Sequence, residues 1–286
     1  MEEKVVQEQE HNIYYMTSLQ IEEWLKKTDI ILVPIGSCEQ HGPHLPVATD
    51  GISAWLITVR AAKKADVPHT PLIWMGYSPQ HVIRPGTITL REDTFQNLIY
   101  DVARSLIHMG FNKVIFATGH TSNIKILDSV LRKIRYETGA LVGIFRADAE
   151  FWPKVCQDIF ENPPEETPGW HGSEGETSVC LLFDPKCVDL EKMVATKVHA
   201  PRWLTEKFSK RDGNPYVILD NKYEALYLPM DHNEYSDTGV IGNPYRATRE
   251  KGEKIVERMA TIFAEYINEL KKVKIVVKNR EFINRV

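Results

Sequence analysis

The chain has 286 residues, of which 43% are hydrophobic and 26% are charged, a composition typical of a folded globular protein rather than a disordered one. Its 35 basic and 39 acidic side chains leave a formal net charge of −4, so electrostatics gives no reason to expect nucleic acid or an anionic membrane as a partner. The apolar runs are too short to span a membrane, and we expect no signal peptide. Four cysteines without a C-x-x-C pair favour reduced thiols in a cytoplasmic protein.

Strand and helix patterns alternate along most of the chain. In order we expect a helix beginning after Thr17, a strand at 30–35, a helix at 50–65, a strand at 71–75, a helix at 92–109, a strand at 112–118, a helix ending near 138, a strand at 140–145, a helix at 175–183 and a helix at 248–271. This alternation predicts βαβ crossovers and a mostly parallel sheet, hence an α/β fold. We expect one domain over residues 1–286, with an N-terminal arm at 1–15, an irregular region at 195–245 and a C-terminal extension at 272–286.

A dense run of polar residues follows the first predicted strand. It reads Gly-Ser-Cys-Glu-Gln-His-Gly-Pro-His over 36–44 and continues to Asp50. Glu39 and His41 are two residues apart, so in an extended segment both side chains point to one side. Asp50 falls at a predicted helix start, where the helix dipole stabilises a carboxylate. A single such side chain is usually only hydrogen-bonded, but three grouped at the end of a strand predict ligands for a divalent metal ion.

Two further clusters carry chemistry. His120 lies in a glycine-containing turn after the strand predicted at 112–118, and the carboxyl ends of parallel strands share one edge of the sheet. The other cluster contains His171, Glu174 and Glu176, which offer possible ligands and a possible general acid or base. The alternative for this cluster is helix capping, with Ser173 as the cap and Glu176 completing a capping box.

Four segments of the chain resemble the creatininase (creatinine amidohydrolase) family, in family order, at 34–50, 118–123, 171–178 and 238–244. The first segment is long and specific, and together the four extend over most of the chain. The resemblance implies a three-layer α/β/α fold with a mostly parallel central sheet. It also implies a dinuclear site with two divalent ions per chain, zinc or manganese, and a homo-oligomer, in many members a hexamer.

Carried onto this sequence, the resemblance implies that Glu39, Asp50 and His120 hold one ion. His41 would hold the other, and Asp50 would bridge the two. His171 would be the catalytic acid or base near the scissile bond.

The chain departs from the family pattern at one position. Creatininases carry a glutamate two residues after the histidine that matches His120, and this chain has Ser122 there. A second ion would then need another carboxylate, for which we favour Glu176. Glu174 would be a catalytic proton carrier or an alternate ligand. The departure also argues against creatinine itself as the substrate.

The resemblance implies attack of metal-bound hydroxide on a carbonyl of a small, polar, cyclic substrate. One branch of the family opens 3-dehydro-scyllo-inosose, a diketo-inositol, and others act on formamidopyrimidines or a mycofactocin precursor peptide. We expect C–C ring cleavage of the diketo-inositol in inositol catabolism, because polar and aromatic loop residues could contact such a ring: His44, His81, Trp170 and His232. The alternatives are a cyclic amidohydrolase that cleaves a C–N bond, a non-catalytic binding protein on the same scaffold, and a metal-free structural subunit.

Overall fold

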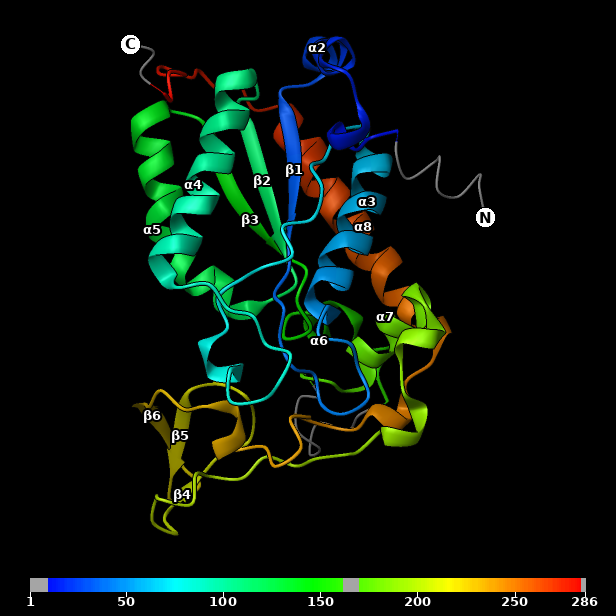
Figure 1. The fold of residues 1–286 in the computed structure, drawn as a ribbon, viewed down its shortest axis with the longest axis vertical. Helices are drawn as coiled ribbons and strands as arrows, with labels where there is room; N and C mark the ends of the chain where they lie inside the picture. Colours follow the sequence, from blue (N-terminus) through cyan, green and yellow to red (C-terminus); the bar gives the residue numbers. More distant parts are fainter. Residues whose placement is uncertain (1–9, 162–169, 284–286) are drawn as a thin grey trace.

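A three-stranded parallel sheet separates two layers of helices in the computed structural model, which describes residues 10–161 and 170–283 (Figure 1). The strands β1 (Ile30–Ile35), β2 (Lys113–Thr118) and β3 (Leu141–Arg146) lie in the order β1-β2-β3. Ile30 pairs with Lys113, which pairs in turn with Leu141, so the carboxyl ends of all three strands meet at one edge. The predicted α/β fold with a parallel central sheet is therefore confirmed.

Both faces of the sheet are buried because side chains alternate along each strand. Ile30 and Leu32 of β1 face one core, and Ile31 and Val33 face the other. The first core is covered by α3 (Thr49–Ala65), α7 (Glu174–Phe183) and α8 (Arg249–Lys271), and the second by α4 (Glu92–Met109) and α5 (Thr121–Thr138). Figure 1 shows these two groups of helices on opposite sides of the strands.

Several shorter elements complete the described structure. They are α2 (Ser18–Lys27), α6 (Pro153–Cys156) and the 3-10 turns η1 (Ile13–Tyr15), η2 (Pro79–His81), η3 (Pro185–Cys187), η4 (Leu190–Lys192), η5 (His232–Glu234) and η6 (Pro244–Arg246). Thr17 caps α2 and forms the expected capping box with Gln20. No helix in the described ranges is both long enough and apolar enough to cross a membrane.

The prediction of a regular strand at 71–75 is wrong. The segment does run parallel to β1, but only through isolated bridges such as Leu32 with His69 and Ile35 with Ile73. Pro71 lies between these bridges and has no backbone N–H to donate, so the ladder is interrupted. Part of the predicted N-terminal arm also packs here, since the backbone N–H of Ile13 donates to the carbonyl of His69 at 2.9 Å.

A second, antiparallel sheet lies in the region expected to be irregular. Its strands are β4 (Phe208–Ser209), β5 (Tyr216–Leu219) and β6 (Tyr223–Tyr227), in that order. Figure 1 places this small sheet beyond the carboxyl ends of the parallel strands. It has its own apolar cluster, centred on Val217, Met230 and Ile241.

The backbone of the turn after β2 packs closely against the first turn of α3, and a glycine substitution can test this packing. A Cβ atom at Gly119 would lie 2.0 Å from the carbonyl oxygen of Asp50, whereas one at Gly143 in β3 would meet nothing closer than 3.9 Å. We expect Gly119→Ala to lower the free energy of unfolding by about 1–3 kcal/mol, because backbone must move to make room. Gly143→Ala should leave it unchanged or raise it by about 0.5–1 kcal/mol. Urea denaturation of the two variants measures the difference, and equal stability would contradict the packing described.

Candidate metal centre and substrate cavity

Three side chains from separate segments converge at the carboxyl edge of the parallel sheet. Glu39 comes from the loop after β1, Asp50 from the first turn of α3, and His120 from the turn after β2. His120 Nδ1 lies 3.2 Å from Glu39 Oε2 and 3.3 Å from Asp50 Oδ2. All three residues are buried, so the structure brings together the set expected to hold the first ion.

A second set of three adjoins the first and shares Asp50 with it. His41 Nε2 lies 3.4 Å from Asp50 Oδ1 and 3.6 Å from Glu176 Oε2. Asp50 thus directs one carboxylate oxygen to each set, the arrangement of a bridging ligand. The backbone N–H of Gly172 donates to Glu176 Oε2 at 2.6 Å and fixes that carboxylate in place.

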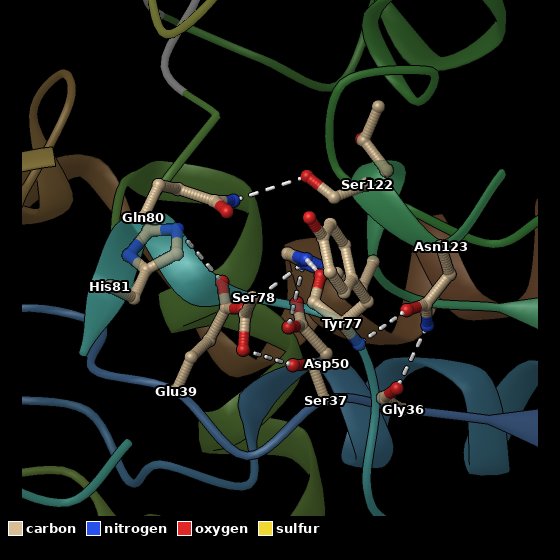
Figure 2. Close-up of polar contacts among 12 residues, drawn as sticks. Gly36, Ser37, Glu39, Asp50, Tyr77, Ser78, Gln80, His81, Ser122 and Asn123 are labelled. Carbon is tan, nitrogen blue, oxygen red and sulfur yellow. Dashed lines mark hydrogen bonds and ion pairs between the residues drawn. The ribbon is translucent and has the colours of Figure 1, made fainter. Parts of the chain in front are cut away.

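The loops that carry these residues are tied together by side-chain amides and hydroxyls (Figure 2). Asn123 donates through Nδ2 to the carbonyl of Gly36 at 3.0 Å and accepts at Oδ1 from the N–H of Tyr77, also at 3.0 Å. Ser37 and Ser78 share a hydrogen bond of 3.0 Å between their hydroxyls. These contacts join the ends of β1 and β2 to the loop before η2, and so limit how far the converging side chains can separate.

The donor atoms in the two sets fit divalent metal ions. Glu39 Oε2, His41 Nε2 and Asp50 Oδ2 are buried and, apart from the ion-pair approaches to one another's residues and to His120, have no hydrogen-bond partner among the described residues. A buried polar atom without a partner costs free energy, which a bound cation would recover. Within each set the ligand atoms lie within 4.8 Å of one another. Imidazole nitrogen and carboxylate oxygen are donors that suit zinc and manganese.

Electrostatics within the site favours positive charge. Burial lowers the pKa of His120, but the carboxylates of Glu39 and Asp50 outweigh it and raise that pKa well above its usual value. Glu176 and Asp50 do the same for His41. Burial raises the pKa of Asp50, yet the rings of His41 and His120 bring it to about 2. The carboxylates therefore attract protons onto the rings, and a metal ion would replace those protons.

A cluster of histidines forms the wall beside the metal ligands. The rings of His81 and His171 stack at 4.7 Å between centroids, and each lies 4.6 Å from the ring of His232. His81 Nε2 also faces Glu39 Oε1 at 3.4 Å (Figure 2). Burial, together with the charge of His41 and neighbouring histidines, lowers the pKa of His171 well below its usual value and so favours the neutral ring.

A small cavity of about 100 Å³ opens onto both sets of ligands. The predicted residues His81, Trp170, His171 and His232 line it. Residues that the sequence patterns did not single out line it as well: Gln80, Lys125, Asp148, Glu150 and Asn214. Ser122 contributes its hydroxyl, which accepts from Gln80 Nε2 at 3.1 Å (Figure 2).

Three predicted site residues do not line the cavity: His41, which lies buried behind it in the second ligand set, and Glu174 and His44, which belong to neither set. The carboxylate of Glu174 accepts from Lys251 Nζ at 2.6 Å and from the backbone N–H of Glu161 at 3.0 Å, on the side of α7 that faces α8. It is therefore engaged away from the metal ligands, and Glu176 is the carboxylate that joins them. His44 is buried against Thr177, with 3.0 Å between Nε2 and Oγ1, so it supports α7 rather than the cavity.

The expected capping arrangement of α7 is only partly present. Ser173 is the N-cap residue, and its hydroxyl accepts from the N–H of Glu174. The carboxylate of Glu176 does not turn back to complete a capping box, since it accepts from Gly172 and faces His41. The predicted metal-ligand position and the helix cap are thus divided between two residues, Glu176 and Ser173.

The fold and this pair of ligand sets define a class of protein, metal-dependent enzymes that combine an α/β/α fold with a two-ion centre at the sheet edge. The family description "Creatininase: Creatinine amidohydrolase" matches residues 14–267, and the chain belongs to the creatininase family. It is a metal-dependent hydrolase.

Individual relatives support this assignment. The chain is 29% identical over 266 residues to 3-dehydro-scyllo-inosose hydrolase of Thermotoga maritima, covering 89% of this chain and 82% of that protein. It is 27% identical to creatinine amidohydrolase of Pseudomonas putida, covering 84% of this chain and 89% of that protein. Among solved structures, a Zn-Zn form of a creatininase variant has a TM-score of 0.71 at 26% identity, covering 92% of this chain and 98% of the other. A manganese creatininase has the same TM-score of 0.71 at 25% identity, covering 92% and 99%.

The two glutamates of α7 give a matched test of the ligand set. Glu176 faces His41, whereas Glu174 pairs with Lys251. We expect Glu176→Gln to lower the metal content from two ions per chain to one, because an amide is a poorer ligand than a carboxylate. Glu174→Gln should retain both ions and instead lower thermal stability, because it removes one partner of a largely buried ion pair.

Elemental analysis after dialysis against metal-free buffer measures the metal content, and thermal melts measure stability. Loss of an ion from Glu174→Gln together with retention of both in Glu176→Gln would contradict the assignment.

Proposed function

We propose that this protein opens a small polyhydroxylated ring by hydrolysis, with 3-dehydro-scyllo-inosose of inositol catabolism as the substrate and a C–C bond as the bond cleaved. The observation that carries the proposal is the cavity lining beside the metal ligands. Ser122 stands where creatininases carry a glutamate, and its hydroxyl is paired with the Gln80 amide. An uncharged hydroxyl and amide replace a carboxylate at this point.

The rest of the lining suits a cyclitol. Such a ring carries hydroxyls around its edge and C–H groups on its two faces. Trp170 and Ile241 offer apolar surface for a face, while Lys125, Glu150 and Asn214 offer donors and acceptors for the edge. Similarity to the hydrolase of Thermotoga maritima supports the same substrate class.

When bound, the two divalent ions supply an activated water at neutral pH and polarise the carbonyl under attack. Glu39, Asp50 and His120 would hold one ion, and His41, Asp50 and Glu176 the other.

His171 is positioned to move the proton. Its Nε2 lies 2.7 Å from the backbone carbonyl of Gln40, which can only accept, so Nε2 carries the hydrogen. Its Nδ1 therefore has a free lone pair on the side of Glu39, whose Oε1 is 3.9 Å away. Nδ1 accepts a proton as water adds to the carbonyl and returns it to the carbon that leaves as an enolate.

A cyclic amide is the second candidate substrate. The same ligands and the same His171 could cleave a C–N bond, with Nδ1 returning its proton to the leaving nitrogen. Similarity to creatinine amidohydrolase of Pseudomonas putida favours this reading. We rank the cyclic amide lower because Ser122 replaces the glutamate that creatininases carry.

The proposal also covers the cellular location and the oligomeric state of the enzyme. We infer a cytoplasmic homo-oligomer, a hexamer as in many family members. Large apolar side chains exposed on the small sheet are available for contacts between copies: Tyr216, Tyr223, Leu226 and Tyr227. Four free cysteines fit a reducing compartment.

Turnover on a small panel tests the substrate. We expect the zinc- or manganese-loaded enzyme to open 3-dehydro-scyllo-inosose and to leave creatinine and other cyclic amides intact, with liquid chromatography and mass spectrometry as the readout. Clear release from an amide with no cleavage of any oxidised inositol would overturn the proposal.

The role of His171 is tested on the same reaction. His171→Gln should lower kcat by about 10²–10⁴-fold with metal content retained, because the proton then has no acceptor at Nδ1. His108→Gln is the matched control, because His108 belongs to α4 and its ring contacts the carbonyl of Arg280 instead of the cavity. Its activity should be unchanged, and a His171→Gln enzyme as active as this control would contradict the role.

A further inference from the structure

The side-chain amide of Gln40 lies at the centre of the histidine cluster. Its Nε2 is 3.0 Å from His81 Nδ1, 3.1 Å from His171 Nε2 and 3.4 Å from His232 Nδ1. Gln40 is buried, and neither the metal ligands nor the proton transfer described above needs its side chain. Three imidazoles around one amide nitrogen call for an explanation.

The amide can take only one of its two orientations. The backbone N–H of Gly42 lies 3.0 Å from Gln40 Oε1, and an N–H can only donate. The oxygen of the amide must therefore face Gly42. The NH₂ group, with its two hydrogens, must face the histidines.

The two amide hydrogens go to His81 and His232. His171 cannot accept one at Nε2, because that nitrogen already carries the hydrogen that it donates to the Gln40 carbonyl. His81 Nδ1 and His232 Nδ1 are therefore acceptors. A neutral imidazole has one donor and one acceptor nitrogen, so in both rings the hydrogen must lie on Nε2.

This tautomer gives each ring a defined task. His81 directs Nε2–H toward Glu39 Oε1 at 3.4 Å and orients that metal ligand. His232 directs Nε2–H at no partner among the described residues, although the ring is buried and lines the cavity. A buried donor without a partner is costly unless a ligand satisfies it. Burial also brings the pKa of His232 to about 3, which keeps the ring neutral and the choice of tautomer meaningful.

We propose that Gln40 is a positioning residue whose amide holds His81 and His232 in their Nε2–H tautomers, and that His232 Nε2–H donates to an oxygen of the substrate, a carbonyl or hydroxyl. The cavity then presents one imidazole donor at His232 and one imidazole acceptor at His171 Nδ1. The substrate half of this statement rests on the proposed function; the tautomer half does not.

Nitrogen NMR reads the tautomers directly. The full chain, labelled with ¹⁵N-histidine and loaded with zinc, would be sedimented and measured by magic-angle spinning, with the His232 signals assigned by their loss in His232→Phe. We expect a protonated Nε2 and an unprotonated Nδ1 at His232. A protonated Nδ1 in the unsubstituted protein would overturn the proposal, whatever the variants do.

Gln40→Glu reverses the hydrogen bonds with almost no change in shape. A carboxylate accepts, so the hydrogens of His81 and His232 should move to Nδ1 and the two ¹⁵N signals of His232 should exchange character. Gln80→Glu is the matched control, because it adds the same charge to the same cavity while Gln80 itself contacts Ser122. It should leave the His232 tautomer unchanged. If the tautomers were unchanged in a folded, zinc-loaded Gln40→Glu protein, the positioning role of Gln40 would be contradicted.

Activity provides the second arm. With zinc content retained, Gln40→Glu should lower kcat/KM by roughly 10- to 100-fold, the usual effect of removing a group that orients others in a metal site. Wild-type activity in Gln40→Glu after a tautomer reversal would overturn the donor role of His232. Absence of turnover by the unsubstituted enzyme on every panel compound would instead count against the proposed function, and the spectroscopic result would stand.

Discussion

The close approach of backbone at the end of the parallel sheet is the constraint on which the site depends. Gly36, at the end of β1, and Gly119, after β2, both lie against the first turn of α3, where a Cβ atom would meet backbone at 2.6 Å and 2.0 Å. Only glycine allows this contact. It pushes Asp50 between the two strand ends, where one carboxylate can reach ligands from both loops.

Burying polar groups at this edge costs folding free energy, which the rest of the fold offsets. Three carboxylates and several imidazoles lie buried beside the sheet edge, and such groups stabilise a protein less than apolar side chains of the same volume. Two extensive apolar cores, one on each face of the sheet, flank the polar cluster. Conflict between local polarity and burial is typical of functional sites, where the surrounding structure holds an arrangement that would not form by itself.

Sequence patterns predicted the part of the site that depends on short segments after strands. Glu39, Asp50 and His120 follow predicted strands or open a predicted helix, so the topology alone brings them to one edge. The choice between Glu174 and Glu176 could not be made this way. Two side chains that are two residues apart on a helix are related by a rotation of about 200° around the helix axis, so they point to nearly opposite sides. Which of the two faces His41 depends on how α7 packs against α8.

Other features required tertiary information. The small antiparallel sheet lies among residues dense in proline, glycine and charge, so alternation along its short strands was not recognisable. The segment at 71–75 has strand-forming residues, yet Pro71 breaks its ladder. Gln40 is an ordinary polar residue in sequence, and only the arrangement of three rings around its amide distinguishes it.

The small sheet has a consequence for how this scaffold diversifies. A larger depression of about 460 Å³ lies between it and the start of α5, and this depression shares Gln80, Ser122, Lys125, Gly213 and Tyr235 with the catalytic cavity. The candidate ion ligands come from the helices and loops at the edge of the main sheet, while part of the lining of this depression comes from the small sheet and the loop after it, which have their own apolar cluster. Exchange of residues in 208–231 would therefore reshape this depression and leave the candidate ion ligands, His171 and His232 in place, which suits an architecture that serves chemically different compounds.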